Sequence, residues 1–344
     1  MSKIPWGSSQ GKLPQTDIAK GTRMRLTEGA AGARILAFGG YQPARVVTND
    51  ELAATVETSD EWIRSRVGIA SRRIAGPDET VADMAVAAGG KALAASGLSP
   101  EDIDLVIVAT CTPEVQIPNT AATVARRLGI SAPGAFDMNA ACAGFCYALA
   151  SASDSVRAGT AGNVLVIGAE KLSQWIDWTD RSTCIIFADG AGAAVVGPVA
   201  DPDEVGVGPV VWGSAGDLAD KIFIKDRDSF IVQEGQAVFR WATTALHPVA
   251  KQACERAGVD PTELAAFVPH QANLRIIEAI ARKLGAPQAL VADDIVTAGN
   301  TSSASIPLAL SRMIEHGELA SGAPVLLLGF GAGICYAGQV ITVP

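Results

Sequence analysis

The sequence predicts an α/β protein made of two similar halves, and three observations support that prediction. From residue 34 onward, apolar runs of strand length alternate with longer Ala-rich segments of helical period. This alternation is typical of strands that form a parallel or mixed sheet covered by helices. The same motifs return in the same order about 160 residues later. The chain has 344 residues, 49% of them hydrophobic, which is enough to bury a large core.

The first half contains strands and helices in regular alternation. Each expected strand is a short, nearly continuous apolar run, and each expected helix is a longer Ala-rich segment with apolar residues at helical spacing. The expected strands are residues 34–41, 104–110, 134–138 and 163–170, and the expected helices are residues 81–97, 119–129 and 142–159.

The second half repeats this pattern. Gly97 and Gly258, which close two of the matching segments, are 161 positions apart. The ARRLG motif at residue 125 and the ARKLG motif at residue 281 are 156 apart. The pairs YALAS with PLALS and NVLVIG with PVLLLG are 160 and 161 apart. The expected helical runs are residues 239–258 and 271–285, and the expected apolar runs are residues 265–269 and 324–328.

The duplication sets the expected domain boundaries. Residues 1–33 are rich in Gly, Ser, Thr and Lys without periodicity, so we expect a flexible arm there. The two halves are expected at residues 34–204 and 205–344, with a bridge from about residue 198 to residue 235. Duplicated α/β halves place ligands near their junction, beside the carboxyl ends of strands. Catalytic residues are therefore expected on matching loops of the two halves.

Composition and charge disfavour several kinds of partner. A formal net charge of −9 and a pI near 4.9 disfavour binding to nucleic acid. No run of about 18 uncharged apolar residues is present, and the first residues lack the apolar block of a signal peptide, so no membrane association is expected. Six cysteines without regular spacing favour a reducing, cytoplasmic compartment, mostly structural thiols such as Cys111, Cys184 and Cys335, and no metal site.

Cys142 is the candidate nucleophile. It lies between the expected strand 134–138 and an Ala- and Leu-rich helix. A thiol at a helix start meets unpaired N–H groups and the positive end of the helix dipole, which favour the thiolate and lower its pKa. The alternative is a buried structural cysteine, which is how Cys146, one helical turn later, is interpreted.

His270 and Asn300 are the candidate partners. Of the three histidines, His247 and His316 lie in or near helical runs and are interpreted as structural or solvated. His270 instead stands where the apolar run 265–269 meets a helix. Asn300 follows a glycine in a loop of small residues, where an asparagine is often no more than a turn residue.

The loop that holds Asn300 duplicates the loop that holds Cys142. At an offset of 160 residues, Ser302 corresponds to Cys142. A cysteine, a histidine and an asparagine are thus expected at three strand-to-helix junctions of one duplicated fold.

These residues resemble the thiolase-like condensing enzymes, and specifically β-ketoacyl-acyl-carrier-protein synthase III. The resemblance covers about residues 34–344 and implies a five-layered αβαβα core of two duplicated halves. The motifs that carry it are TSDEWIRSRVGI at 58–69, ACAGF at 141–145, DRSTCIIFADGAGAAVV at 180–196, PHQANLRII at 269–277, GNTSSASIP at 299–307 and GFGAG at 329–333.

The resemblance implies a decarboxylative condensation that initiates fatty acid synthesis. Cys142 would take an acyl group from acyl-CoA, and the enolate of malonyl-acyl-carrier protein would attack the acyl-enzyme. His270 and Asn300 would donate hydrogen bonds to the malonyl thioester oxygen. The backbone N–H groups of Cys142 and Ala332 would form the oxyanion hole, although relatives commonly have glycine in place of Ala332. No cofactor is implied, because acyl-CoA and malonyl-acyl-carrier protein are substrates.

The resemblance also implies residues that bind the substrates. Trp62 and Arg181 would hold the adenine of CoA between them, and Arg66 would meet phosphate. The other implied CoA or pantetheine contacts are Gly235, Asn273 and Phe330, and the implied acyl-pocket residues are Ile117 and Phe187.

Acyl carrier protein and a second copy of the chain are the implied partners. Because carrier protein is acidic, its docking needs a local basic face, which would be formed by Arg240, Arg275, Arg282 and Lys283. An ordinary solvated helix face is the alternative. In relatives, which are homodimers, a residue of one subunit closes the acyl pocket of the other, and Ile117 stands at that place. Some relatives have Phe there, so the smaller Ile117 predicts branched or longer primers.

The sequence also bears on other functions of this fold. A thiolase needs a second cysteine near the C-terminal glycine-rich turn, where Phe330 stands instead. The GFGAG motif is not a dinucleotide site, because only eleven residues follow Gly333. A priming ketosynthase or acyltransferase of a polyketide or other secondary-metabolite pathway would have the same three residues, and that alternative stays open. A non-enzymatic protein of this fold is disfavoured by the intact trio.

Overall fold

The computed structural model describes residues 27–344, so most of the predicted arm at 1–33 lies outside the described residues. Ala30 already donates a backbone hydrogen bond to Val156, and the first strand begins at Gly32. The strands are β1 (Gly32–Tyr41), β2 (Arg45–Thr48), β3 (Ser71–Ile74), β4 (Leu105–Ala109), β5 (Gly134–Met138), β6 (Val164–Lys171), β7 (Asp189–Val199), β8 (Val211–Ser214), β9 (Ile222–Phe223), β10 (Val232–Gln233), β11 (Ala266–Pro269), β12 (Leu290–Val291), β13 (Pro324–Phe330) and β14 (Cys335–Thr342). The α-helices are α1 (Asn49–Ala53), α2 (Asp60–Val67), α3 (Val81–Ser96), α4 (Thr120–Arg127), α5 (Gly144–Arg157), α6 (Gly235–Ala257), α7 (Leu274–Leu284), α8 (Ile295–Ala298) and α9 (Ser305–Glu315).

Two five-stranded sheets repeat one topology. The first has the order β1-β7-β6-β4-β5, and the second has the order β8-β14-β13-β11-β12. In the first sheet β5, β4 and β6 are parallel, while β7 and β1 are antiparallel to their neighbours. In the second sheet β12, β11 and β13 are parallel, while β14 and β8 are antiparallel. The duplication predicted from the sequence motifs is therefore present in the strand order.

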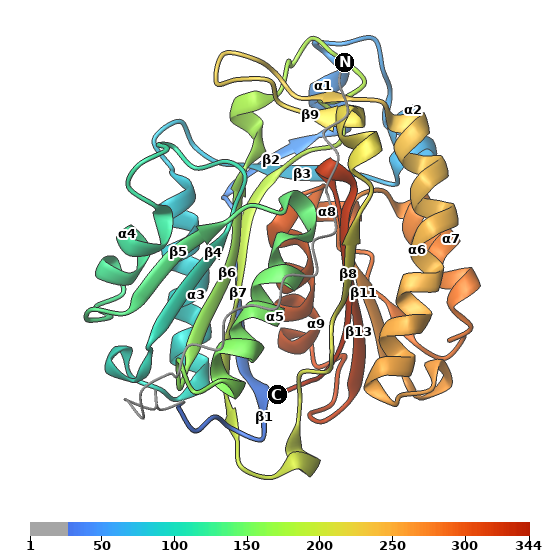
Figure 1. The fold of residues 1–344 in the computed structure, drawn as a ribbon. Coiled ribbons are helices and arrows are strands. Elements are labelled where there is room, and N and C mark those ends of the chain that lie inside the picture. The colour runs from blue at the N-terminus through green and yellow to red at the C-terminus, as the bar shows by residue number, and fades with distance from the viewer. Residues whose placement is uncertain (1–26) are drawn as a thin grey trace, which may run out of the picture.

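The sheets and helices form five layers, as predicted. Figure 1 shows α5 and α9 between the two sheets, α3 and α4 outside the first sheet, and α6 and α7 outside the second. The central layer is apolar: Leu149 of α5 and Leu310 of α9 are fully buried with Val166 and Leu327 from the two sheets. Because this layer touches both sheets, it holds the two halves together.

Glycines in the first sheet let the second half approach closely. A Cβ at Gly168 of β6 would lie 2.4 Å from the carbonyl oxygen of Ser303, and a Cβ at Gly192 of β7 would lie 2.5 Å from the backbone nitrogen of Leu308. Since no side chain could fit at either distance, glycine is required at both positions. The loop that carries Asn300 therefore lies directly on the first sheet.

Two matching turns lead into the central helices. A 3₁₀ turn at Ala141–Ala143 precedes α5, and a 3₁₀ turn at Ser302–Ala304 precedes α9. Both begin with a residue at positive φ, 46° at Ala141 and 51° at Ser302. Cys142 therefore corresponds to Ser303, and the predicted correspondence with Ser302 is wrong by one residue. The motif offsets ranged from 156 to 161, so they could not define the register to one position.

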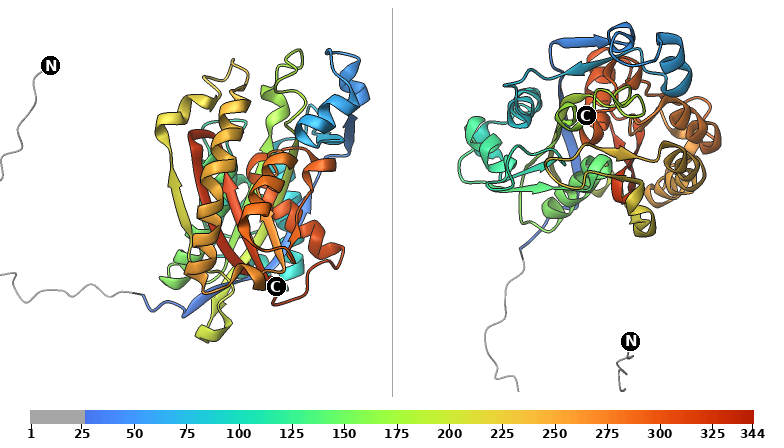
Figure 2. Two further views of the ribbon diagram at one scale, coloured as in Figure 1. Left: turned by 90° about the vertical axis from the view of Figure 1, so that its right-hand side faces the viewer. Right: turned by 90° about the horizontal axis from the view of Figure 1, so that it is seen from above.

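Short elements gather at one end of the sheets. Figure 1 shows α1, α2, the β2–β3 pair and β9 at this end, and Figures 1 and 2 show the C-terminus at the opposite end. The predicted bridge from residue 198 to residue 235 contains the β9–β10 pair, whose residues also line the cavity described below. Within residues 27–344, no helix has the length and apolar character needed to cross a membrane.

Candidate active site

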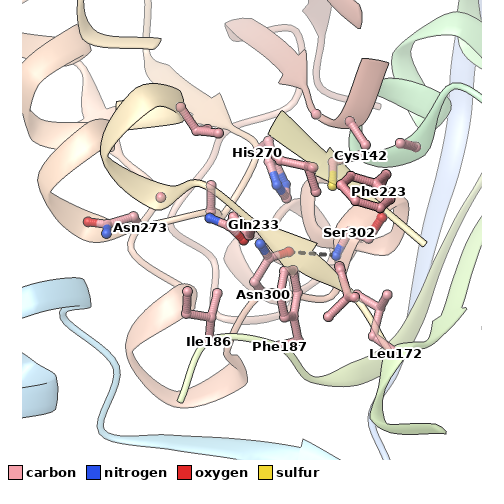
Figure 3. A pocket seen from close by; sticks show the side chains of 18 of the residues that line it. Cys142, Leu172, Ile186, Phe187, Phe223, Gln233, His270, Asn273, Asn300 and Ser302 are labelled. Carbon is pink, nitrogen blue, oxygen red and sulfur yellow. Dashed lines mark hydrogen bonds between the residues drawn. The ribbon is translucent and has the colours of Figure 1, made fainter. Parts of the chain in front are cut away.

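One cavity of about 940 Å³ brings the predicted catalytic residues together. Cys142 comes from the turn after β5, His270 from the end of β11, and Asn300 from the loop after α8. All three line the cavity, and Figure 3 shows them around the same space. The site is therefore built from both halves, at strand-to-helix junctions.

Cys142 is a protonated thiol in this cavity. Burial raises its pKa to about 12, and the carboxylate of Glu170 also raises it. The Ser302 hydroxyl and the backbone N–H groups of Ala332 and Cys142 act in the opposite direction. The expectation that the helix start lowers the pKa of the thiol is thus wrong, because the cost of burying the thiolate exceeds what these donors recover.

The backbone N–H groups expected to form the oxyanion hole lie beside the thiol. Ala332 begins a 3₁₀ turn after β13, and both its N–H and that of Cys142 act on the Cys142 sulfur. A Cβ at the neighbouring Gly331 would lie 2.6 Å from the Cβ of Cys142 and 2.7 Å from its backbone nitrogen. Gly331 therefore allows the two turns to touch, while the alanine at 332 keeps its backbone donor.

His270 is buried and uncharged at neutral pH. It is 2% exposed, and burial lowers its pKa to about 3. Its Nδ1 lies 2.7 Å from Oγ of Ser305, the first residue of α9. The ring of Phe330 packs against the imidazole with centroids 5.2 Å apart and an interplanar angle of 74°. Ser305 and Phe330 thus fix the orientation of the ring.

The side chain of Asn300 is oriented by its own loop. Its Oδ1 accepts a hydrogen bond from the backbone N–H of Ser302 at 2.9 Å, drawn as a dashed line in Figure 3. Its backbone pairs with the segment around Phe187: its N–H donates to Ile186 O, and its carbonyl accepts from Ala188 N–H. Because the amide oxygen is engaged, the Nδ2 group is the donor that Asn300 offers to the cavity.

Trp62, Arg66 and Arg181 form a stacked cluster at the cavity mouth. The guanidinium carbon of Arg181 lies 4.6 Å from the centroid of the Trp62 ring, and that of Arg66 lies 5.5 Å from it. Arg181 also donates to the carbonyl of Glu57 at 2.7 Å. The space between Trp62 and Arg181 is thus closed by their own contact, and a base could enter only if the two separated.

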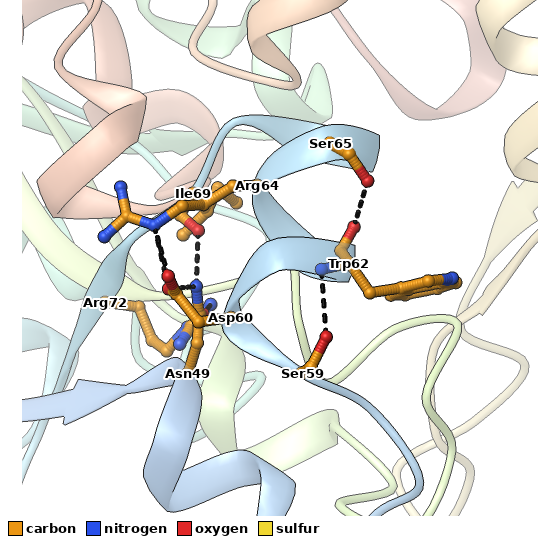
Figure 4. Close-up of polar contacts among 8 residues, drawn as sticks. All are labelled: Asn49, Ser59, Asp60, Trp62, Arg64, Ser65, Ile69 and Arg72. Atoms are coloured by element: carbon orange, nitrogen blue, oxygen red, sulfur yellow. Dashed lines mark hydrogen bonds and ion pairs between the residues drawn. The ribbon is translucent and has the colours of Figure 1, made fainter.

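A polar network holds the helix that carries Trp62 (Figure 4). The hydroxyl of Ser59 caps α2 by accepting from the Trp62 N–H at 3.1 Å. Asp60 accepts from the buried Asn49 at 2.8 Å, and Asn49 in turn accepts from Arg72 at 2.8 Å. The fully buried Arg72 also donates to the carbonyls of residues 47 and 185. This network joins α2 to the first half.

The other implied CoA contacts line the cavity in different ways. Asn273 caps α7 by accepting from Arg275 N–H and donates to the Arg66 carbonyl at 3.2 Å, so its side chain links α7 to α2. Gly235 is the first residue of α6, and a Cβ there would meet Gln233 Nε2 at 3.9 Å, an ordinary contact. Phe187 lines the cavity. Ile117 does not line it and is 85% exposed.

The four basic residues predicted for docking divide into two pairs. Arg240 and Arg275 line the cavity, and the guanidinium carbon of Arg275 lies 5.3 Å from the centroid of the Phe239 ring. Arg282 pairs with Glu278 at 3.8 Å, and Lys283 donates to the carbonyl of Thr243 at 2.6 Å. Neither residue of this second pair lines the cavity.

Comparison with known proteins relates this geometry to a family. Residues 136–216 match the model of 3-oxoacyl-acyl-carrier-protein synthase III, and residues 254–343 match the model of its C-terminal part. The chain is 58% identical over 313 residues to β-ketoacyl-acyl-carrier-protein synthase III 4 of Streptomyces coelicolor, covering 91% of this chain and 99% of that protein. The chain belongs to the β-ketoacyl-acyl-carrier-protein synthase III family. It is therefore an acyl-transferring condensing enzyme.

Other family members and solved structures agree. The mycobacterial β-ketoacyl-acyl-carrier-protein synthase III of Mycobacterium avium is 48% identical over 334 residues, covering 94% of this chain and 99% of that protein. The synthase III structure from Aquifex aeolicus has a TM-score of 0.87 at 42% identity and covers 91% of this chain and 100% of its own. The priming β-ketosynthase of the R1128 polyketide pathway has a TM-score of 0.89 at 44% identity, covering 93% and 98%. The thiolase-like fold is thereby confirmed.

Three residues near the nucleophile were not identified as site residues from the sequence. Cys111, expected in the core, lines the cavity, as does Ser302. Glu170 is fully buried behind them and accepts hydrogen bonds from both residues. Glu170 could have been noticed in the sequence, because it ends the apolar run NVLVIGAE. A charged residue is rarely buried unless it is paired, so a carboxyl group in such a run indicates a special role.

Proposed function

We propose that the chain condenses an acyl group taken from acyl-CoA with malonyl-acyl-carrier protein, giving 3-oxoacyl-acyl-carrier protein and initiating fatty acid synthesis. The observation that carries this proposal is the presence of Cys142, His270 and Asn300 around one cavity of about 940 Å³. A thiol can form a thioester, and two neutral donors can stabilise an enolate. Membership of the synthase III family supports the same reaction.

In the first step, Cys142 attacks the acyl-CoA thioester. The thiol loses its proton as the S–C bond forms, and the carbonyl oxygen becomes negative in the tetrahedral intermediate. The N–H groups of Cys142 and Ala332 are the donors for that oxygen. Removing one such donor costs about 2.7–4 kcal/mol in comparable sites.

In the second step, the malonyl thioester loses carbon dioxide and becomes an enolate. The hydroxyl of Ser305 accepts from the Gln271 N–H at 3.3 Å and lies 2.7 Å from His270 Nδ1. We assign the hydrogen of this hydroxyl to Nδ1, and the ring proton is then on Nε2. His270 Nε2–H and Asn300 Nδ2–H are then two neutral donors for the enolate oxygen. The enolate carbon attacks the acyl-enzyme and the Cys142 sulfur leaves as the thiolate, which takes one proton from solvent to restore the thiol.

Substrate contacts follow from the cavity mouth. We assign the adenine to the space between Trp62 and Arg181, the phosphates to Arg66, and the pantetheine to the walls formed by Gly235, Asn273 and Phe330. This assignment is supported by the position of all six residues on the cavity lining. The acidic carrier protein would dock on the basic side, where Arg240 and Arg275 lie at the cavity and Arg282 and Lys283 lie farther along α7.

We further propose a homodimer in which Ile117 closes the acyl pocket of the partner. The proposal is supported by the exposure of Ile117, which at 85% is the highest among the large apolar side chains of the described residues, and by the exposed Val115 close to it in the chain. The protein would act in the cytoplasm, since all six cysteines are free. The thiol and the two neutral donors supply each chemical step, so no metal or cofactor is included in the mechanism.

A priming ketosynthase is the second candidate function. Its supporting observation is the similarity to the priming β-ketosynthase of the R1128 polyketide pathway, at a TM-score of 0.89 and 44% identity. The same site would carry out the same condensation, and the two functions differ in the carrier protein that supplies malonate.

The test is intact-mass analysis after incubation with a series of acyl-CoAs. We expect one acyl group per chain on Cys142 and none on Cys142→Ala. Adding malonyl-carrier protein should discharge the acyl group and yield 3-oxoacyl-carrier protein. Fatty-acid and polyketide carrier proteins, compared side by side, distinguish the two functions. Failure of the native chain to form any acyl-enzyme would contradict both.

A further inference from the structure

Glu170 is a fully buried carboxyl group near the end of β6, and the proposed mechanism gives it no role. Cys111 and Ser302 separate it from the cavity, and both line that cavity. Burying a carboxylate is costly unless its oxygens are well bonded. Within residues 27–344, the hydrogen-bond partners of Glu170 are hydroxyls, the Cys111 thiol and a backbone N–H rather than a cation.

The donors around Glu170 come from both halves of the fold. The hydroxyl of Thr112 lies 2.6 Å from Oε2, and the Cys111 N–H lies 3.1 Å from the same oxygen. The hydroxyls of Ser302 and Ser303 lie 3.0 Å and 2.8 Å from Oε1. Thr112 Oγ1 also accepts from the Lys171 N–H at 2.9 Å, so its own hydrogen is available for the carboxyl group.

The contacts of Ser303 leave a place for one proton on Glu170. The Ser303 hydroxyl lies 2.8 Å from Glu170 Oε1 and 2.8 Å from the carbonyl oxygen of Ala109. One hydroxyl hydrogen cannot serve two acceptors. Both contacts are satisfied when Oε1 carries a proton and donates it to Ser303, while Ser303 donates to Ala109. When Glu170 is a carboxylate, one of the two contacts of Ser303 cannot be a hydrogen bond. When Glu170 is a carboxylic acid, both contacts are hydrogen bonds.

Ser302 lies between Glu170 and the nucleophile. Its hydroxyl is 3.0 Å from Glu170 Oε1 and 4.0 Å from the sulfur of Cys111, and it lowers the pKa of the Cys142 thiol. Figure 3 shows Ser302 and Cys142 on the same side of the cavity. Its backbone has a φ of 51°, a strained conformation that persists only where surrounding contacts hold it. Because Ser302 and Cys142 line the same cavity, the Ser302 hydroxyl is placed to reach the thiol, accept its proton and pass its own proton to Oε1.

The charges around Glu170 favour such a transfer. The ionised carboxyl group raises the pKa of Cys142, because two negative charges in one buried region repel each other. Burial also raises the pKa of Glu170 above its ordinary range, which makes it a better proton acceptor than an exposed carboxylate. The titratable groups that face it are the thiols of Cys111 and Cys142, since the Lys171 amine is directed to the carbonyls of residues 76, 77 and 79.

We propose that Ser302 and Glu170 hold the proton of Cys142 while the acyl group is loaded, an inference that rests on the proposed function. As the S–C bond forms, the thiol proton moves to Ser302 Oγ, and the Ser302 proton moves to Glu170 Oε1. As the bond between the acyl carbon and the CoA sulfur breaks, a proton returns along the same path to the CoA thiolate, which leaves as the thiol. No proton is gained or lost overall, and Glu170 returns to the carboxylate. His270 and Asn300 act in the later condensation step.

The experiment measures acyl-enzyme formation by rapid-quench intact mass with acetyl-CoA alone, between pH 6 and pH 9. Ser302→Ala removes the connecting hydroxyl and keeps the backbone N–H that holds Asn300. Glu170→Gln removes the acceptor. We expect both variants to acylate about 10²–10⁴-fold more slowly than the native chain at pH 7, with a rate that rises about tenfold per pH unit as the thiolate fraction grows. The native rate should be nearly flat from pH 7 to pH 9.

Thr110→Val is the matched control, because it removes a hydroxyl that lies 3.2 Å from the other carboxyl oxygen, Oε2, and leaves Ser302 and the contacts of Oε1 in place. It should keep the flat profile. Condensation by Ser302→Ala that has already been acylated should match that of the native chain. The proposal is overturned if Ser302→Ala acylates at the native rate, or if Thr110→Val loses as much. If the native chain forms no acyl-enzyme, the proposed function itself is wrong and the proton path with it.

Discussion

At the residue scale, burial determines the protonation of the two most reactive groups. It raises the pKa of Cys142 to about 12 and lowers the pKa of His270 to about 3, so both are neutral at pH 7. Two neutral groups can share a dry cavity at little electrostatic cost, whereas a resting thiolate and imidazolium would each have to be desolvated. Charge therefore develops only during the reaction, where the N–H groups of Cys142 and Ala332 can meet it.

The first prediction concerns the contact between Gly331 and Cys142. In Gly331→Ala the new Cβ would lie 2.6 Å from the Cβ of Cys142, so one of the two turns must move. We expect acylation to slow about 10²–10³-fold, because the oxyanion donor at residue 332 is displaced, and stability to fall by about 1–3 kcal/mol. Rapid-quench mass analysis and urea denaturation measure the two effects.

Gly333→Ala provides the control for this prediction. Gly333 also has a restricted backbone, with a φ of 69°, but a Cβ there would meet only the Cys335 sulfur at 3.5 Å. Its replacement should cost about 1 kcal/mol of stability and leave acylation far less affected. Equal losses of acylation in the two variants would contradict the role given to the Gly331 contact.

The second prediction concerns the pH dependence of stability. The pKa of His270 is about 3 in the folded chain, against an ordinary value of 6.5. The unfolded state therefore binds more protons as the pH falls below 6.5, and the stability that depends on neutral His270 is lost toward pH 3. Between pH 7 and pH 5 this loss is about 2 kcal/mol. In His270→Asn this loss should be absent. The measurement is the free energy of unfolding from urea denaturation at pH 7 and at pH 5, compared between the native chain and the variant.

His316 provides the matched control for that measurement. Its side chain is 58% exposed, so His316→Asn should retain the full native difference between pH 7 and pH 5. Asp294, whose pKa is raised to about 6 by burial, contributes equally to the native chain and to His270→Asn. In His316→Asn it loses the smallest of the causes that act on its pKa, a change that is small beside the loss expected in His270→Asn. An unchanged difference in His270→Asn would mean that His270 is protonated in the folded chain at pH 5.

At the element scale, many of the long helices and the parallel strands could be predicted from the sequence, but the antiparallel strands β7 and β14, the helix α9 and the small elements at the cavity mouth were not. The segments α3, α5, α7 and β6 lie within three residues of the predicted ranges, because their apolar period reflects burial in the layers. The pairs β2–β3 and β9–β10 and the helix α2 bury few apolar residues. Their positions depend on long-range polar contacts, such as the bond from Arg72 to the carbonyl of Ile185, which have no local pattern.

The third prediction tests the polar network that supports α2. Asn49 is 1% exposed and joins Asp60, Ile69 O and Arg72, all at 2.8 Å. Asn49→Ala leaves the Arg72 guanidinium short of a partner and should cost about 1–3 kcal/mol of stability. Because α2 carries Trp62, the KM for acyl-CoA should also rise. Condensation by enzyme already acylated should be unchanged, and a fall in that step as well would indicate general damage to the fold.

The fourth prediction concerns α7 as the docking surface for carrier protein. Arg275 lies at the cavity against Phe239. In Arg275→Glu we expect the KM for malonyl-carrier protein to rise about tenfold and its salt dependence to weaken, since a charge attraction is replaced by repulsion. Lys251→Glu, which makes the same charge change at an exposed position of α6, should have little effect. Acylation by acyl-CoA should respond to neither variant.

At the scale of the whole molecule, the site depends on the way the two halves meet. The offsets between motifs were enough to predict the duplication and to associate Cys142, His270 and Asn300. They could not reveal Glu170, because its proposed role depends on Ser302 of the other half. They also placed the match to Cys142 at Ser302, whereas the two turns match Cys142 with Ser303. The cost of burying Cys142 likewise depends on neighbours that come together only in the fold.

The last prediction joins two copies of the chain. Ile117 is 85% exposed and does not line the cavity of its own chain, so it can influence primer choice only from a partner subunit. In solution we expect a dimer by light scattering, and a native preference that extends to branched or longer acyl-CoAs. Ile117→Phe adds volume at the end of the partner's pocket and should lower kcat/KM for those primers about tenfold or more, while acetyl-CoA is little affected.

Val205→Phe is the control for this prediction, because Val205 is 38% exposed and does not line this cavity. It should leave the primer preference unchanged. A monomer, or a native enzyme confined to acetyl-CoA, would contradict the assignment of Ile117 to the acyl pocket.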